Sequence, residues 1–385
     1  MRPHAPGTPR RVLFVNHEGG VSGAELSLLG LLAKLDRRRF VGAVACPRGE
    51  LARRLRPLGV PHVPLRLSRL RRAGPVRTLR DLARLVPAVL RLTGIVRGHA
   101  VELVHANSTT AFLSAAPAAK LARVPVVWHV RDLVGLGRAG KLLFRMADAV
   151  ACVSEAVQRH LIPSGGDLDK LWTVTNGIDL DAFRRAARPG TVRAGLGIAP
   201  DAPVVTQISQ ITPWKGHRFL LDALVRVRSE FPRLRVLFVG EPMTPEDAKY
   251  REALEARAAE LGLANTVTFT GWRDDVASVI ADSDVVALPS RAEPFGRAAL
   301  EALALGKPVV GTRAGALPEL VTHRRTGFLV DFGDTDALAD ALVTLLGSPD
   351  LRAEMGRNAA VEAAPFDITR TVNQLQNLYD DLLAR

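Results

Sequence analysis

The sequence contains few cysteines. Cys46 and Cys152 are the two cysteines in 385 residues, and both stand inside apolar, strand-like runs. Such a pair suits neither a disulfide framework nor a cysteine-ligated zinc site, which excludes the small disulfide-stapled domains typical of secreted proteins. We therefore expect a protein of the reducing cytosol.

Long apolar runs are also absent. No run approaches the roughly 20 residues with which a helix spans a bilayer. The first run, VLFV at residues 12–15, is too short for the core of a signal peptide. Hydrophobic residues still make up 47% of the chain, and 385 residues are too many for one ordinary domain. The sequence therefore predicts two domains, each with a sizeable core.

Acidic residues are scarce in one segment. The chain carries a formal net charge of +13, and residues 51–100 contain twelve arginines against a single acid, Asp81. The same segment has no Phe, Tyr or Trp. This argues against a single-stranded nucleic acid as partner, because its bases stack on aromatic side chains. A solvated arginine-rich surface, contact with nucleic-acid phosphates alone, and an anionic membrane face remain as interpretations.

We favour the membrane face for the arginines between Arg53 and Arg97. Arginine alternates with Leu and Val in this stretch, a pattern typical of a helix that lies in a membrane interface. Pro75 and Pro87 predict two short helices rather than one long helix, because proline interrupts helical hydrogen bonding. The expected location is cytoplasmic, peripheral at the inner face of the cell membrane.

Strand-like runs alternate with helical segments along the chain. The runs are VLFVNH, VGAVAC, VELVHA, VPVVWHV and AVACVS in the first half, and VVTQIS, RLRVLFVG, VTFTGW, DVVALPS, KPVVGT and GFLV in the second. This alternation predicts an α/β protein with doubly wound parallel sheets. We expect an N-terminal domain over 1–185, a C-terminal domain over 186–365, and a Pro-, Gly- and Arg-rich interdomain linker from 184 to 203. The last helix, within 366–385, is expected to pack back on the first domain.

The second half contains a candidate anion site. Ligands of such sheets bind beyond the carboxyl ends of the strands, where the run DVVALPS is followed by a loop with Glu293 and by an apolar helix that starts near Gly296. The N-terminus of that helix offers free N–H groups to a phosphate. The carboxylates of Glu293 and Glu301 could then contact the sugar and the ribose of a nucleotide diphosphate sugar. Alternatively, Arg297 pairs with Glu301 at i, i+4, and Glu293 is a solvated loop acid.

The order of several motifs resembles the retaining nucleotide-sugar glycosyltransferases of family four. The longest matching block runs from ADSDVVALPSRAEPFGRAALEALALGKPVV to RTGFLV, and SGAE, VTNGID and ITPWKGH match as well. The family places seven residues between two glutamates, and Glu293 and Glu301 have this spacing. The resemblance implies the GT-B fold, in which two Rossmann-like, doubly wound parallel-sheet domains face each other across a cleft. The first domain binds the acceptor and the second the donor.

The same resemblance implies roles for individual residues. Glu293 is expected to contact the transferred sugar, Glu301 the ribose, and Lys215 the diphosphate. Gln210 stands where the family has an arginine. Stabilisation of the negative charge on the leaving diphosphate is therefore expected to depend more strongly on Lys215 and the helix N-terminus. The remaining implied donor-binding residues are Trp272, Arg273, Phe295, Gly296, Arg297 and Ala298.

Two features of the first half complete the candidate site. In the loop HEGGVSGAE, Ser22 and Glu25 have the spacing of a capping box. By resemblance this loop is the family's glycine loop, with Ser22 and Gly23 at its glycine positions. His129, near the end of the run VPVVWHV, is either a structural hydrogen-bonding residue or the catalytic histidine that faces the sugar in the family.

The sequence thus predicts a retaining glycosyltransferase, a hexosyltransferase of cell-envelope or polysaccharide biosynthesis. It is expected to pass sugar from a nucleotide diphosphate sugar to a hydroxyl on a sugar, glycan or lipid-linked acceptor, with His129, Lys215 and Glu293 as catalytic residues. No metal or other cofactor is expected, because no cluster of His, Cys and carboxylate residues is visible. The alternatives are a nucleotide-sugar 2-epimerase on the same fold, for which the Lys-Gly and paired-Glu motifs are not expected, and a basic nucleic-acid-binding protein.

Overall fold

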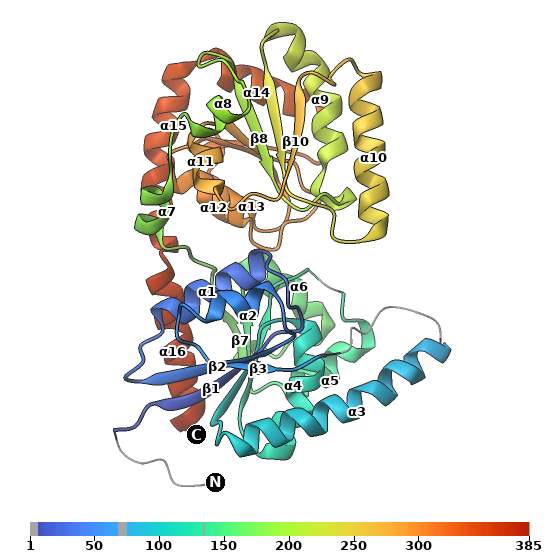
Figure 1. The fold of residues 1–385 in the computed structure, drawn as a ribbon, viewed down its shortest axis with the longest axis vertical. Coiled ribbons are helices and arrows are strands. Elements are labelled where there is room, and N and C mark those ends of the chain that lie inside the picture. The colour runs from blue at the N-terminus through green and yellow to red at the C-terminus, as the bar shows by residue number, and fades with distance from the viewer. Residues whose placement is uncertain (1–6, 68–74, 134, 385) are drawn as a thin grey trace. The chain divides into compact units, whose positions relative to one another are not determined.

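The computed structural model describes residues 7–67, 75–133 and 135–384, without the side chains of residues 75–84 and 138. The chain divides into two compact units. The first unit is Met1–Gly177 together with Ile368–Arg385, and the second is Ile178–Asp367. Each contains one parallel sheet with helices on both faces (Figure 1). The two doubly wound sheets predicted from the sequence are therefore confirmed.

The described part of the first unit holds a seven-stranded parallel sheet in the order β3-β2-β1-β4-β5-β6-β7. The strands are β1 Arg10–Val15, β2 Phe40–Cys46, β3 His62–Pro64, β4 Leu103–Ala106, β5 Val126–Val130, β6 Ala149–Cys152 and β7 Leu171–Thr173. The helices are α1 Gly23–Lys34, α2 Glu50–Leu55, α3 Pro75–Gly98, α4 Thr109–Ala122, α5 Gly140–Met146, α6 Glu155–Leu161 and α16 Ile368–Ala384. The sequence did not predict β3 and β7, because three residues give no readable alternation.

Side-chain alternation along the strands assigns the helices of the first unit to two layers. Val127 belongs to the core that β1, β2 and β4 form with α1, α2 and α16. Its neighbour Trp128 points the other way and stacks on Phe112 of α4 at 4.8 Å between ring centroids. Helix α16 follows the second unit in sequence, yet it packs on α1 and contributes Tyr379 and Leu375 to this core.

Helix α3 corrects the expectation of two short helices. It runs without a break from Pro75 to Gly98 with Pro87 in its interior. Pro75 begins the helix, where its missing N–H is not needed. The helix continues past Pro87 because its buried side packs along α4. The buried residues of this side are Ala88, Val89, Leu92, Thr93 and Val96.

The second unit holds a six-stranded parallel sheet in the order β10-β9-β8-β11-β12-β13. Its strands are β8 Val204–Ile208, β9 Arg235–Val239, β10 Val267–Gly271, β11 Val285–Leu288, β12 Val309–Thr312 and β13 Gly327–Val330. Its helices are α7 Leu180–Ala186, α8 Thr191–Gly195, α9 His217–Glu230, α10 Pro245–Glu260, α11 Val276–Ala281, α12 Arg297–Ala304, α13 Leu317–Leu320, α14 Thr335–Gly347 and α15 Pro349–Glu362. All six runs predicted as strands in this half form the sheet.

The expected interdomain linker, residues 184–203, belongs instead to the second unit. Helices α7 and α8 form there, and Val192 of α8 packs in a cluster with Val204 and Leu237 of the sheet. The carboxylate of Asp282 accepts hydrogen bonds from the backbone N–H groups of Val192 and Arg193, both at 2.9 Å. A contact ninety residues away in sequence therefore orders a stretch whose Pro and Gly content is typical of a linker. Within the described residues, no helix combines the length and apolar character of a membrane span.

Candidate functional site

Two charged side chains meet at the carboxyl edge of the second sheet. Lys215 ends the 3-10 turn that follows β8, and Glu293 lies in the loop that follows β11. Lys215 Nζ donates to Glu293 Oε2 at 2.7 Å, and both side chains are largely buried. The Ser290 hydroxyl donates to the same oxygen at 3.2 Å. The interpretation of Glu293 as a solvated loop acid is therefore wrong.

Two glycines allow the backbone to place this pair. At Gly216 φ is +75°, and a Cβ there would lie 1.9 Å from the carbonyl oxygen of Pro289. At Gly315 φ is +60°, and a Cβ would lie 2.1 Å from the carbonyl oxygen of Glu293. The next residue, Ala316, donates its N–H to that oxygen at 2.7 Å. A side chain at Gly216, the glycine of the Lys-Gly motif, would thus collide with the backbone, which explains why glycine stands there. Gly315 has the same role beside Glu293, and the sequence analysis missed it.

Helix α12 begins directly after Glu293. Gly296 is its N-cap with φ +93°, and Arg297 and Ala298 are its first residues. Phe295 is buried and packs against Phe366 at 6.2 Å between ring centroids, which anchors the loop before the helix. The helix N-terminus, with its unsatisfied N–H groups and positive dipole end, is thereby held beside the Lys215–Glu293 pair.

Glu301 lies inside α12 and is 6% exposed. Its Oε1 accepts a hydrogen bond from Arg297 Nε at 2.7 Å, as the i, i+4 interpretation predicts. Burial raises the pKa of Glu301, and the neighbouring guanidinium of Arg297 opposes that shift. The buried carboxylate thus has its expected cationic partner, and a second carboxylate oxygen remains to contact another group.

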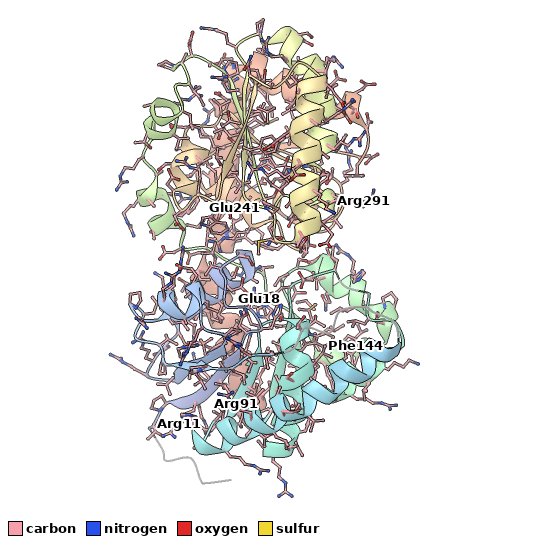
Figure 2. All side chains as sticks on the ribbon, turned by 45° about the vertical axis from the view of Figure 1, so that its right-hand side comes forward. Arg11, Glu18, Arg91, Phe144, Glu241 and Arg291 are labelled. Carbon is pink, nitrogen blue, oxygen red and sulfur yellow. The ribbon has the colours of Figure 1, made fainter. Side chains whose placement is uncertain are left out.

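The other predicted donor-binding residues of this unit lie on loops at the same edge of the sheet. Gln210 is half-buried after β8. Trp272 and Arg273 follow β10, where Arg273 binds Asp275 through Nε at 2.8 Å and Nη2 at 2.6 Å. The loop after β11 also carries Arg291, labelled in Figure 2, whose guanidinium lies 5.1 Å from the centroid of the Phe332 ring.

In the first unit, the predicted capping box forms at the start of α1. The Glu25 carboxylate accepts hydrogen bonds from the backbone N–H of Ser22 at 3.0 Å and from its hydroxyl at 2.6 Å. Asn16 Nδ2 donates to the other carboxylate oxygen at 3.1 Å. Gly23 is the first residue of the helix and is exposed. Hydrogen bonds from Ser22 to the buried carboxylate of Glu25 therefore fix the position of this loop.

His129 lies on β5 and is 1% exposed. Its Nδ1 is 3.1 Å from His105 Nε2 and 3.3 Å from an Nη atom of Arg131. The opposite nitrogen of His105 is 2.7 Å from the hydroxyl of Tyr379 on α16. Burial and the charge of Arg131 lower the pKa of both histidines, to about 3 for His105. Both rings are therefore neutral at pH 7.

These side chains belong to one buried polar network, which consists of Asn16, Glu25, His105, Asn107, His129, Arg131, Asn176 and Tyr379. Arg131 donates to Asn107 Oδ1 at 3.0 Å and to Asn176 Oδ1 at 2.8 Å, and Asn107 donates to Asn16 Oδ1 at 2.9 Å. The sequence analysis missed most of its members. A signal was present, since Asn16, Asn107 and Arg131 each directly follow a buried strand.

Across the described residues, no three His, Cys, Asp or Glu side chains are grouped so as to hold a metal ion.

Two family models match successive parts of the chain. The model of Glycosyltransferase Family 4 matches residues 21–182, and that of Glycosyl transferases group 1 matches residues 190–361. Among curated proteins, the D-inositol 3-phosphate glycosyltransferase of Nocardia farcinica is 35% identical over 292 residues, which are 74% of this chain and 62% of that protein. The corresponding enzyme of Corynebacterium glutamicum is 34% identical over 62% of this chain and 58% of its own length. The alignments with these relatives thus span about three fifths of their length.

Solved structures extend the similarity to nearly the whole chain. The crystal structure of HepE from Anabaena in complex with UDP and glucose is 28% identical, covers 96% of this chain and 99% of its own, and has a TM-score of 0.82. WaaG, described as a glycosyltransferase involved in lipopolysaccharide biosynthesis, is 16% identical with a TM-score of 0.71 and shows the fold alone. Its two parallel sheets and these matches show that the chain belongs to the family-four glycosyltransferases with the GT-B fold.

Proposed function

We propose that the protein is a retaining hexosyltransferase that uses a UDP-sugar as donor and a hydroxyl group as acceptor. The observation that carries this proposal is the buried Lys215–Glu293 pair beside the N-terminus of α12. A cation, a carboxylate and free backbone N–H groups are the groups that a sugar diphosphate requires. The complexes of HepE with UDP and with UDP-glucose support the choice of base and sugar class.

The proposed reaction breaks the bond between the anomeric carbon and the diphosphate oxygen. Negative charge develops on the departing diphosphate, and Lys215 together with the N-terminus of α12 stabilises it. The acceptor oxygen attacks the same face of the sugar, forms the new bond to the anomeric carbon, and passes its proton to the departing diphosphate. The configuration is thereby retained. Glu293 contacts the sugar, and Glu301 binds the ribose of the donor.

The remaining predicted residues have supporting roles in this proposal. Phe295, Gly296, Arg297 and Ala298 present the helix N-terminus to the sugar and distal phosphate. Gln210, Trp272 and Arg273 bind the nucleotide from the neighbouring loops. In the first unit, His129 contacts a sugar oxygen, and the loop with Ser22 and Gly23 approaches the phosphates or the acceptor.

Donor binding is the first test of this function. We expect UDP to bind with a Kd below about 1 mM, since diphosphate and ribose contacts together exceed the roughly 4 kcal/mol that this affinity requires. Isothermal titration calorimetry with UDP, GDP and ADP measures the Kd of each nucleotide. Transfer is measured as release of UDP from UDP-glucose in the presence of acceptors, inositol 3-phosphate included. If none of the three nucleotides binds at millimolar concentration, the donor site is misassigned.

Turnover is expected to be independent of divalent cations, because Lys215 and the α12 N-terminus supply the positive charge that a metal ion supplies to the diphosphate elsewhere. EDTA should leave the rate of UDP release unchanged. Loss of activity with EDTA, followed by recovery with Mg²⁺ or Mn²⁺, would show that a cation serves the leaving group.

We further propose that α3 rests on an anionic membrane, where the acceptor is lipid-linked. Its exposed side carries Val86 and Leu90, which are 58% and 61% exposed, together with the exposed Arg91 and Arg97. Arg91 is labelled in Figure 2. Apolar side chains flanked by arginines suit a lipid interface. Both arginines also donate to backbone carbonyls, Arg91 to Pro64 and Arg97 to Leu121. Arg69, Arg71 and Arg72, together with the side chains of Arg77, Arg80 and Arg84, lie outside the described residues.

Liposome flotation tests this surface. Recovery should require anionic lipid and should decrease as NaCl rises from about 0.05 to 0.5 M, because salt screens the attraction. The double variant Val86→Ser, Leu90→Ser should reduce recovery several-fold, since it removes the apolar part of the patch. The matched control is Leu168→Ser, Val361→Ser, which removes two equally exposed apolar side chains elsewhere. Equal recovery with neutral and anionic vesicles would contradict the membrane proposal.

A further inference from the structure

One nitrogen of His129 is buried without a hydrogen-bond partner among the residues that the structure describes. This atom is Nε2, whereas Nδ1 on the other side of the ring has two close neighbours, His105 Nε2 and Arg131. A buried unpaired nitrogen costs stability, and a partner supplied by a bound ligand would account for its presence here. The chemistry of Nε2 depends on which of the two ring nitrogens carries the proton.

Arg131 decides the position of that proton. A guanidinium group has N–H donors and no acceptor. Its Nη atom lies 3.3 Å from His129 Nδ1, so Nδ1 must present a lone pair. The neutral ring of His129 consequently carries its proton on Nε2. This buried atom is therefore a hydrogen-bond donor and has no lone pair with which to act as a base.

The same reasoning orients His105 and Tyr379. Because His129 Nδ1 accepts, His105 Nε2 at 3.1 Å must donate to it. The proton of His105 is then on Nε2, and its Nδ1 accepts from the Tyr379 hydroxyl at 2.7 Å. Burial raises the pKa of the Tyr379 phenol, which keeps this donor protonated. Two hydrogen bonds with the same direction thus run from Tyr379 on α16 through His105 to the ring of His129.

We propose that Tyr379 and His105 are positioning residues that act together with Arg131 to hold His129 in the Nε2–H tautomer, and that this N–H donates to a sugar hydroxyl or ring oxygen. The inference rests on the proposed glycosyl transfer for the identity of the ligand oxygen. The tautomer itself follows from Arg131, His105 and Tyr379 alone. It excludes His129 as the base that removes the proton of the acceptor.

Histidine tautomers are directly measurable. The chain has nine histidines, and selective ¹⁵N-histidine labelling with long-range proton–nitrogen correlation distinguishes the two tautomers of each ring. Assignment uses His105→Gln and His129→Gln. We expect His105 and His129 in the wild-type protein to be neutral Nε2–H tautomers throughout pH 6 to 8. An Nδ1–H tautomer at His129, or a charged ring, would overturn the proposal.

Tyr379→Phe removes the first donor of the chain and keeps the ring that packs on Phe40 and His105. We expect the ¹⁵N signals of His105 to shift, because its Nδ1 has lost the hydrogen bond that supports the donation from its Nε2 to His129. The value of kcat should fall about five- to tenfold, the effect of one hydrogen bond, with the donor KM unchanged. Tyr250→Phe is the matched control, since Tyr250 is the other tyrosine of the chain and its hydroxyl accepts from the N–H of Arg218.

The outcomes separate this proposal from the proposed function. If Tyr379→Phe leaves the His105 and His129 signals and kcat unchanged, Tyr379 has no positioning role. A change in kcat without a change in tautomer signals would assign Tyr379 a merely structural effect and also overturn the proposal. If the wild-type tautomers are as stated but no UDP-sugar is consumed, the proposed function fails while the tautomer assignment stands.

Discussion

Replacement of Lys215 by alanine is expected to lower turnover by about 10²- to 10³-fold, the loss typical of removing one preorganised donor to a developing charge. Lys215 is largely buried and its ammonium group is 2.7 Å from Glu293. The side chain stacks on Trp214, with Nζ 4.0 Å from the ring centroid, so its position is fixed before the donor binds. A preorganised cation of this kind acts mainly in the transition state. The donor KM should therefore change much less than kcat, which steady-state UDP release measures.

Loss of Lys215 also leaves the buried carboxylate of Glu293 without its cation, although the Ser290 hydroxyl remains bound to it. Thermal unfolding must accompany the kinetics, so that a folding defect is distinguished from lost catalysis. The control is Lys249→Ala, because Lys249 is an exposed lysine of α10 in the same unit. Turnover within a factor of about three of wild type would contradict the proposed charge stabilisation.

Replacement of Glu301 by glutamine should raise the donor KM by about 10- to 100-fold and leave kcat nearly unchanged. Glutamine keeps the shape of the side chain but removes the negative charge, and a hydrogen bond to a charged group contributes about 1.5–3 kcal/mol. Glu301 is buried and already holds Arg297, so the substitution also releases this guanidinium from its partner. Titration with UDP should show the same loss of affinity, because the ribose contact is made in the bound nucleotide as well.

Two comparisons sharpen this result. Glu252→Gln, on the exposed side of α10, is the control for loss of one carboxylate and should leave the donor KM unchanged. Because burial raises the pKa of Glu301, its ionised form is lost earlier on acidification than that of an exposed glutamate. UDP affinity of the wild type should accordingly decrease as pH falls, whereas that of Glu301→Gln should vary less. A kcat defect with unchanged UDP affinity would contradict the binding role.

The sequence by itself determined the features that depend on neighbouring residues. Strand periodicity located the six strands of the second sheet, because period-two and continuous apolar patterns are local. The spacing of Ser22 and Glu25 predicted the capping box, and the i, i+4 spacing predicted the Arg297–Glu301 pair, both of which form. The start of α12 at Gly296 was predicted in the same way. The resemblance to the family likewise depended on the order and spacing of short motifs along the chain, the Glu293 and Glu301 pair among them.

Only the tertiary structure decided the contacts between distant residues. It keeps α3 continuous through Pro87, since packing on α4 outweighs the local cost of proline. It orders the expected linker through Asp282. It pairs Lys215 with Glu293, 78 positions apart.

The hydrogen bond from Tyr379 to His105 joins residues 274 positions apart. No periodicity or spacing rule reaches that far, because such contacts arise from the packing of whole helices and sheets rather than from local backbone preference.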